Sequence, residues 1–318
     1  MADELIDRLD AAIDAVMARR DATAALRDPE LAPLVRIAAD VRHYPGTDFK
    51  ARLRAQLQGR KAMSSTAVLT TSVREGFTTV TPYVWVPDRG LADFLIRVFD
   101  AVETRVADNG PHGTHRELRI GNSMVMLGEN PEIKHAPARS MAFHVFVDAV
   151  DEVFAKALAA GGESLGEPAD RPYGERSGFI KDAYGNHWYI GTPLGPESFA
   201  HALRTVTPYL HSRDVRGYID FLARAFGAVE EVVHESEPGF IPYARARIGD
   251  AAIEFGTADP MPGALFVYVA DPDAAYDQAL AAGAKALSPP ADQPSGIRIG
   301  FVEDPLGNHW YIARPATP

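Results

Sequence analysis

The sequence predicts an α+β protein built from four repeats of a βαβββ unit, preceded by a short helical segment. The hexapeptide Gly-Asn-His-Trp-Tyr-Ile occurs at residues 185–190 and again at 307–312, each time three residues after an aspartate. A second marker, Thr-Val-Thr-Pro-Tyr, occurs at 79–83 and again at 205–209. The two markers keep the same order, about 100 residues apart in each copy, which indicates a duplicated region.

Composition limits the class of protein. The chain has 318 residues, a net charge of -11 and no cysteine. This length suits two domains plus an extension, and the lack of cysteine excludes disulfides, thiolate zinc sites and a cysteine nucleophile. The negative charge argues against nucleic acid and anionic membranes as partners. There is no signal-peptide pattern and no uncharged apolar run of about 18 residues, so we expect a soluble, cytoplasmic protein.

Residues 1–60 have helical periodicity. Apolar residues recur on one face of a first helix, and Asp28-Pro29 supplies a capping residue and a first-turn proline for a second helix. A third short helix can begin after Thr47-Asp48. Residues 61–76 are rich in Ser and Thr, which is typical of a linker. We expect a small helical hairpin or bundle that could contact another protein.

After residue 77 the pattern changes to one strand, one helix and three short strands, and this order occurs four times. Two units fall in each copy of the duplicated region. We therefore assign a first domain to residues 77–195 and a second domain to residues 203–315. The four units are expected to begin with strands at 79–86, 140–147, 206–210 and 264–269.

Paired βαβββ units that end in Asp-x-x-Gly-Asn-His-Trp-Tyr-Ile resemble the vicinal oxygen chelate superfamily. That superfamily contains glyoxalase I, ring-cleaving dioxygenases, fosfomycin-modifying enzymes and bleomycin-binding resistance proteins. The motifs Thr-Pro-Tyr-Leu, Ala-Phe-Gly-Ala, Arg-Ile-Gly-Asp and Asp-Pro-x-Gly-Asn-His-Trp are similar to its PhnB-like glyoxalase/bleomycin-resistance branch. The resemblance covers about residues 77–315 and implies two cup-shaped domains, each formed by two units.

The resemblance also implies where a divalent metal ion would bind. Metal enzymes of the superfamily use His or Gln on the first strand and Glu on the last strand of each unit, which suits zinc, nickel, iron or manganese. A single carboxylate at these positions cannot hold a catalytic ion, so we expect neither a metal nor another cofactor. The aligned residues are Thr81, Met126, Ala142 and Tyr189 in the first cup, and Thr207, Glu254, Ala264 and Tyr311 in the second.

The expected cup interiors supply the candidate ligand-binding residues. His144 shares a strand face with Ala142, so it could be a displaced metal ligand, a contact to a bound molecule or a structural histidine. An aromatic lining fits a ligand pocket and also fits a filled core. We expect Tyr83, Trp85, Met124, Met126, Phe146 and Tyr189 to line the first cup with His144, and Tyr209, Phe266, Tyr268 and Tyr311 to line a more polar second cup.

Glu254 and His211 are the candidate catalytic pair, because a carboxylate beside an imidazole can act as a general base. The alternative is a buried carboxylate paired with Arg245 or Arg247. Arg176 lies in a charged stretch, residues 167–178, that could be a lid over a ligand or a solvated loop.

The repeated hexapeptides predict structural residues as well. Trp188 and Trp310 are expected in the core, on the strand face opposite the cup. The repetition of His187 and His309 favours a role in holding the Asp-x-x-Gly turn.

Taken together, these features predict a protein that binds a small organic molecule without metal chemistry, as bleomycin-binding relatives do. One alternative is a lyase, isomerase or ring-cleaving dioxygenase that uses a nonstandard set of metal ligands. Another is an interaction protein that acts through residues 1–60. A homodimer is possible, because exchange of βαβββ units between chains is common in this superfamily.

Overall fold

The computed structural model describes residue 73 and residues 76–135, 139–195, 198 and 203–314. These residues belong to one compact unit that spans Thr66–Pro318. The helices expected within residues 1–60 and most of the expected linker lie outside the described residues.

Four βαβββ modules follow one another along the chain, which confirms the number and order of the expected units. Module 1 comprises β1 (Val80–Val86), α5 (Gly90–Phe99), β2 (Val102–Asp108), β3 (Thr114–Ile120) and β4 (Ser123–Glu129). Module 2 comprises β5 (Ala142–Phe146), α6 (Val150–Ala159), β6 (Glu163–Arg171), β7 (Glu175–Lys181) and β8 (His187–Pro193). Module 3 comprises β9 (Val206–Ser212), α7 (Val215–Phe226), β10 (Val229–His234), β11 (Tyr243–Ile248) and β12 (Ala251–Thr257). Module 4 comprises β13 (Ala264–Tyr268), α8 (Pro272–Ala282), β14 (Lys285–Asp292), β15 (Arg298–Glu303) and β16 (His309–Arg314).

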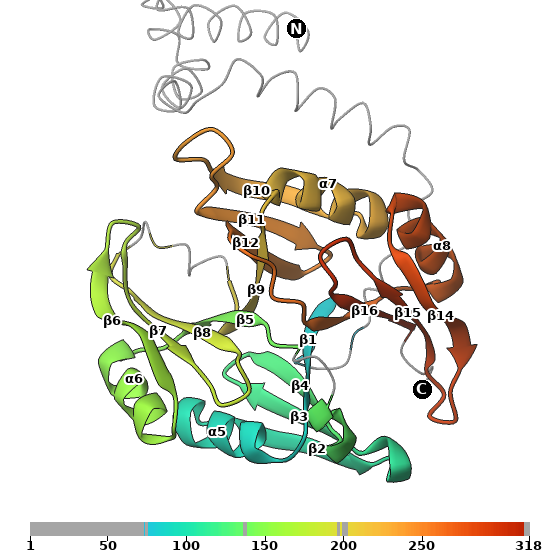
Figure 1. Ribbon diagram of the computed structural model, residues 1–318, viewed down its shortest axis with the longest axis horizontal. Coiled ribbons are helices and arrows are strands. Elements are labelled where there is room, and N and C mark those ends of the chain that lie inside the picture. Colours follow the sequence, from blue (N-terminus) through green and yellow to red (C-terminus); the bar gives the residue numbers. More distant parts are fainter. Residues whose placement is uncertain (1–72, 74–75, 136–138, 196–197, 199–202, 315–318) are drawn as a thin grey trace, which may run out of the picture. The chain divides into compact units, whose positions relative to one another are not determined.

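The modules pair in the order 1 with 4 and 2 with 3. One eight-stranded sheet, the 1/4 sheet, has the strand order β14-β15-β16-β13-β1-β4-β3-β2, and the 2/3 sheet has the order β10-β11-β12-β9-β5-β8-β7-β6. The first strands join the modules, since β1 runs antiparallel to β13 and β5 runs antiparallel to β9. Figure 1 shows the two sheets, with modules 1 and 4 at the two ends of the colour scale.

The expectation that each cup combines two consecutive units is therefore wrong. Every unit offers the same kind of first-strand edge to a partner, and the hydrophobic period of a strand says which face is buried but not which strand lies beside it. Residues 77–195 and 203–315 describe the duplication of the sequence, whereas each sheet takes one module from each copy.

Helices that cover different sheets pack against each other and form a shared core. The helix α5 packs on α6, and α7 packs on α8 (Figure 1). Trp188 stacks on Phe143 of its own sheet, with ring centroids 4.4 Å apart, and lies 5.2 Å from Phe99 on α5 of module 1. Trp310 lies 4.7 Å from Phe226 in the same way. Both tryptophans are fully buried, which confirms their expected place in the core.

The repeated Asp-x-x-Gly-Asn-His-Trp sequence is a turn held by its aspartate. Asp182 accepts hydrogen bonds from the backbone N–H groups of Tyr184 and Asn186, from the Asn186 amide and from the Trp188 indole, at 2.8–3.0 Å. Asp304 receives the equivalent set and also the Tyr218 hydroxyl at 2.6 Å. The side-chain hydrogen bonds that hold these turns converge on Asp182 and Asp304, so the structural role expected for His187 and His309 stays a prediction.

The Thr-Val-Thr-Pro-Tyr marker fastens modules 1 and 3 to each other. The backbone N–H and hydroxyl of Thr79 donate to Asp250 Oδ1 in the β11–β12 turn, at 2.7 and 2.8 Å. The same two groups of Thr205 donate to Asn122 Oδ1 in the β3–β4 turn, at 2.8 and 3.1 Å. Each turn also needs its glycine, because Gly121 and Gly249 have positive φ and a Cβ at Gly121 would meet the Thr205 hydroxyl at 2.2 Å.

We predict that an Asp182→Ala substitution lowers the free energy of unfolding by roughly 3–5 kcal/mol, because four donors lose a charged acceptor inside the core. Chemical denaturation measures the change. The exposed Asp148 provides a control, and Asp148→Ala should change the free energy of unfolding by less than about 0.5 kcal/mol. Equal effects of the two substitutions would contradict the structural role of the turn.

Candidate functional site

A buried group of three ionisable side chains lies in the 2/3 sheet. His144 on β5 is 8% exposed, and Glu254 on β12 and Glu175 on β7 are fully buried. His144 Nδ1 lies 3.1 Å from a Glu254 carboxylate oxygen, and His144 Nε2 lies 3.3 Å from a Glu175 carboxylate oxygen. One imidazole is therefore held between two carboxylates.

Strand pairing brings these residues together from three separate strands. His144 pairs with Tyr189 on β8 and with Thr207 on β9, and Glu254 pairs with Tyr209 on β9. Gly191 lies beside them on β8, and a Cβ there would come within 3.2 Å of both His144 Nε2 and the Glu175 carboxylate. Because glycine has no side chain, His144 and Glu175 can approach each other here.

Electrostatics keep His144 charged. Burial alone would lower the pKa of His144, but the charge of Glu254 and the hydrogen bonds to Glu175 and Glu254 outweigh burial and raise this pKa to about 10. The imidazole is then protonated at neutral pH, donates from Nδ1 to Glu254 and forms an ion pair with Glu175 through Nε2. The Ser198 hydroxyl donates to the second oxygen of Glu175 at 3.0 Å.

Aromatic rings and a second histidine surround this group. The ring of Phe146 lies 4.2 Å from the ring of His144, centroid to centroid. The Tyr189 hydroxyl lies 2.8 Å from His211 Nε2. Burial, and to a smaller extent the charge of His187, lowers the pKa of His211 to about 4, so this ring is neutral at neutral pH. Burial raises the pKa of Tyr189 to about 12. We call the set His144, Phe146, Glu175, Tyr189, Tyr209, His211 and Glu254 the polar cup.

Glu254 and His211, the expected catalytic pair, contact different partners in the structure. Both residues belong to the polar cup, but His144 is the histidine that contacts Glu254, and His211 contacts Tyr189. Arg245 and Arg247, the alternative partners, both bind Glu231, and the Arg245 contact is 2.8 Å long.

Arg176, expected in a lid, lies outside the polar cup. Its guanidinium pairs with Asp151 on α6 at 2.6 Å and with Asp170 at 3.0 Å. The expected loop is mainly the β6–β7 hairpin, and successive side chains on β7 point to opposite faces. Glu175 therefore faces the cup while Arg176 faces the helix, and this alternation is the signal that could have identified Glu175 from the sequence.

The 1/4 sheet carries a second cup, filled mainly by aromatic and other apolar side chains. Tyr83 packs against Phe266 and Tyr311, with ring centroids 5.4 Å apart in both pairs. The Trp85 indole donates to the Tyr311 hydroxyl at 2.6 Å. We call the set Tyr83, Trp85, Met124, Met126, Phe266, Tyr268 and Tyr311 the aromatic cup.

The aromatic cup corrects the expected grouping of the candidate residues. Phe146, His144 and Tyr189, expected in the first cup, lie in the polar cup instead. Phe266, Tyr268 and Tyr311, expected in the second cup, lie with Tyr83 and Trp85. The reason is that module 1 pairs with module 4 and module 2 with module 3. Each cup therefore keeps one of the two modules expected in its lining and exchanges the other.

Corresponding positions in the two cups differ in chemistry. Met126 pairs with Tyr83 as Glu254 pairs with Tyr209, and Phe266 pairs with Tyr311 as His144 pairs with Tyr189. Ile297 precedes Asp304 by the same interval that separates Glu175 from Asp182. The charged group of the polar cup thus corresponds to Ile297, Phe266 and Met126 in the aromatic cup.

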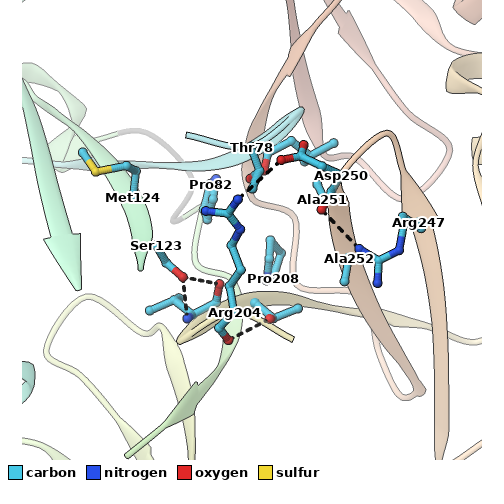
Figure 2. Close-up of a pocket in the computed structure, with 13 residues that line it drawn as sticks. Thr78, Pro82, Ser123, Met124, Arg204, Pro208, Arg247, Asp250, Ala251 and Ala252 are labelled. Atoms are coloured by element: carbon cyan, nitrogen blue, oxygen red, sulfur yellow. Dashed lines mark hydrogen bonds and ion pairs between the residues drawn. The ribbon is translucent and has the colours of Figure 1, made fainter. Parts of the chain in front are cut away.

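A small hollow between the two sheets is a separate feature. Figure 2 shows it, with Arg204 extending between Ser123 and Asp250. Its lining comes from modules 1 and 3 and from Arg204 just before β9, and its volume is about 30 Å³. This is room for one or two water molecules, so in this conformation the hollow is too small for an organic ligand.

Comparison with known proteins identifies the family. The model of the glyoxalase/bleomycin resistance protein/dioxygenase superfamily matches residues 90–190 and 200–312. The chain belongs to this superfamily. An uncharacterized protein from Mycobacterium bovis is 34% identical over 128 residues, which is 36% of this chain and 83% of the relative. A protein from the same organism, named "Putative glyoxylase CFP32", is 27% identical over 183 residues, 54% of this chain and 69% of the relative.

Solved structures confirm the fold. Glyoxalase I from Zea mays superposes with a TM-score of 0.56 and 17% sequence identity, over 74% of this chain and 92% of the maize chain. The likeness concerns the arrangement of the modules only. No helix in the described part of the chain is long and apolar enough to cross a membrane.

The described residues do not fit the metal centre of this superfamily. They contain no group of three or more His, Cys, Asp or Glu side chains arranged to hold an ion. In the polar cup, Glu254 and Glu175 contact opposite nitrogens of His144, so no single point lies within bonding distance of one nitrogen and both carboxylates. In the aromatic cup the corresponding residues, Ile297, Phe266 and Met126, are apolar.

We predict that the free energy of unfolding falls as the pH rises from about 6.5 to about 10. A histidine whose pKa is raised by folding stabilises the fold fully below its unfolded pKa, and this contribution disappears as the pH passes its folded pKa. The size is on the order of a few kcal/mol. Denaturation of the wild type and of His144→Gln across this range measures the effect. Parallel pH profiles for the two proteins would contradict it.

Proposed function

We propose that this superfamily member binds a small organic molecule in the polar cup, without the metal centre that its metal-dependent relatives use. The observation that carries this proposal is the buried group Glu175–His144–Glu254. It lies where the aromatic cup of the same chain has Ile297, Phe266 and Met126.

The aromatic cup shows whether this fold requires charged residues at these positions. Replacing a buried ion pair or triad by well-packed apolar residues is often neutral or stabilising, because desolvation of charges offsets their attraction. The same fold holds hydrocarbon at the corresponding positions, so it does not require charges there. Titratable groups that are buried together at the expense of stability are characteristic of functional sites.

The polar cup offers both polar contacts and stacking surfaces to a ligand. The Tyr189–His211 pair can donate or accept hydrogen bonds, while the buried carboxylates keep His144 charged. The rings of Phe146 and Tyr189 are only partly buried, so they can contact a molecule at the mouth. Pockets for small molecules commonly combine an apolar lining with a few polar groups of this kind. The motifs similar to the PhnB-like branch agree with a binding role.

The test transfers the lining of one cup to the other. We predict that the triple variant Glu175→Ile/His144→Phe/Glu254→Met stays folded, with a free energy of unfolding equal to that of the wild type or about 1–4 kcal/mol higher. The single variant Glu254→Met should lose about 3–5 kcal/mol, because it leaves an imidazolium without one of its carboxylates.

Ligand-induced thermal stabilisation tests binding by the same variants. A ligand that binds the native state raises the melting temperature, so compounds that bind in the polar cup should stabilise the wild type but not the triple variant. Arg176→Ala is the matched control, because Arg176 adjoins Glu175 but faces α6. A triple variant that keeps the same ligand response, or that loses several kcal/mol of stability, would contradict the proposal.

The second candidate is a metal-dependent lyase, isomerase or dioxygenase with a nonstandard set of ligands. Glu254 favours it, because this residue aligns with the last-strand glutamate of the metal enzymes, and so does the name of the mycobacterial relative. If the protein binds its ligand without a metal, the purified chain loaded with nickel, zinc, iron or manganese should retain less than roughly a tenth of an equivalent of metal per chain. Elemental analysis decides, and a stoichiometric ion would establish the metal-dependent alternative.

A further inference from the structure

The aromatic cup contains an acid–base group of its own, formed by residues outside the polar cup. His115 and Glu117 lie two residues apart on β3 and so project to the same face. His115 Nε2 is 3.3 Å from a carboxylate oxygen of Glu117, which is 1% exposed. His115 Nδ1 is 3.4 Å from the Tyr83 hydroxyl. A carboxylate, an imidazole and a phenol therefore follow one another at the wall of the cup.

Stacking surfaces lie next to this group. Tyr83 is at the centre of the ring cluster, 5.2 Å from Trp85 and 5.4 Å from Phe266 between centroids, and its ring is stacked on His115 at 5.7 Å. Trp85, Phe266 and His115 are only partly buried, whereas Tyr83 is 7% exposed. These three partly buried rings are the part of the cluster that solvent reaches.

The fold does not impose this group. Glu117 pairs with Met126 on β4 as Arg245 pairs with Glu254 on β12, so the 2/3 sheet has Arg245 where the 1/4 sheet has Glu117. Gly128, which pairs with His115, is required for the close approach of the rings. A Cβ at Gly128 would lie 2.6 Å from the Trp85 ring and 2.7 Å from the Tyr83 hydroxyl.

We propose that the aromatic cup is a second binding site, for a planar aromatic molecule with an acidic hydroxyl group. The ring stacks on Trp85 and Phe266, and its hydroxyl lies between His115 Nδ1 and the Tyr83 hydroxyl. The proton of the ligand moves to His115 Nδ1, which produces a bound phenolate and an imidazolium. Glu117 is a positioning residue, because it stabilises the imidazolium from the opposite ring nitrogen.

Two physical features support this arrangement. The contact between His115 Nδ1 and the Tyr83 hydroxyl is long for a hydrogen bond, at 3.4 Å, so a ligand oxygen can replace it with two shorter hydrogen bonds. Burial, followed by the influence of Tyr311, raises the pKa of Tyr83. Tyr83 therefore stays protonated and can donate a hydrogen bond to a phenolate oxygen.

The test uses 4-nitrophenol as the probe and the full chain as the protein. Its phenolate form absorbs at a longer wavelength than its neutral form, so absorbance at a pH below its solution pKa reports ionisation on the protein. Trp85 is the partly exposed tryptophan, while Trp188 and Trp310 are fully buried, so the part of the fluorescence quenching that Trp85→Phe removes reports stacking at this cup. We expect saturable quenching together with the phenolate band.

Variants separate the roles of the residues. His115→Gln should weaken binding about tenfold or more and abolish the phenolate band. Glu117→Gln should preserve stacking but raise the pH at which the bound probe ionises. His309→Gln is the matched control, because His309 is another partly exposed histidine of the 1/4 sheet beside a glutamate, Glu303, at 3.7 Å. Denaturation confirms that each variant is folded.

Three results would overturn the proposal. They are the absence of saturable binding, a bound probe that stays in its neutral form, and a His115→Gln variant that binds and ionises the probe as the wild type does. The triple variant of the polar cup tests ligand binding in the polar cup and leaves the residues of the aromatic cup unchanged. The two sites can therefore fail independently.

Discussion

The antiparallel pairing of first strands from non-consecutive modules determines the rest of this structure. β1 joins module 1 to module 4, and β5 joins module 2 to module 3. Each cup lies across one of these seams, so every cup lining combines residues that are far apart in the chain. His144 and Glu254 meet only because β5 runs beside β9. Tyr83 and Tyr311 meet only because β1 runs beside β13.

The seams are supported by contacts that are unrelated to the cups. The Thr79–Asp250 and Thr205–Asn122 hydrogen bonds hold the turns of modules 1 and 3 against each other's first strands. Helices from the two sheets cover a common core, in which Trp188 and Trp310 are anchored by the aspartates of the repeated turns. Because the two tryptophans lie on the strand face opposite the cup residues Tyr189 and Tyr311, the cup residues can change without loss of this core.

Local pattern was sufficient to predict the modules, and insufficient to predict the site. Strand alternation and the repeated hexapeptides located the four units and the buried tryptophans, because these features depend on residues close in the chain. The partner of Glu254 could not be predicted, since the choice between His144 and His211 depends on which modules share a sheet. Arg176 was selected as a candidate for its charge. The alternation of side chains along β7 points Glu175 and Ser177 into the sheet interior and Arg176 away from it.

The two cups also bear on how a duplicated chain can acquire two functions. Each sheet takes one module from each copy of the duplicated region, so one copy alone contains half of each cup. Two separate, identical copies could build the same sheets only as a symmetric dimer, and both cups would then have identical linings. Joining the copies in one chain removes that symmetry. Mutations can then enter one cup at a time, and a histidine between carboxylates can evolve in one cup while its counterpart remains a cluster of aromatic rings.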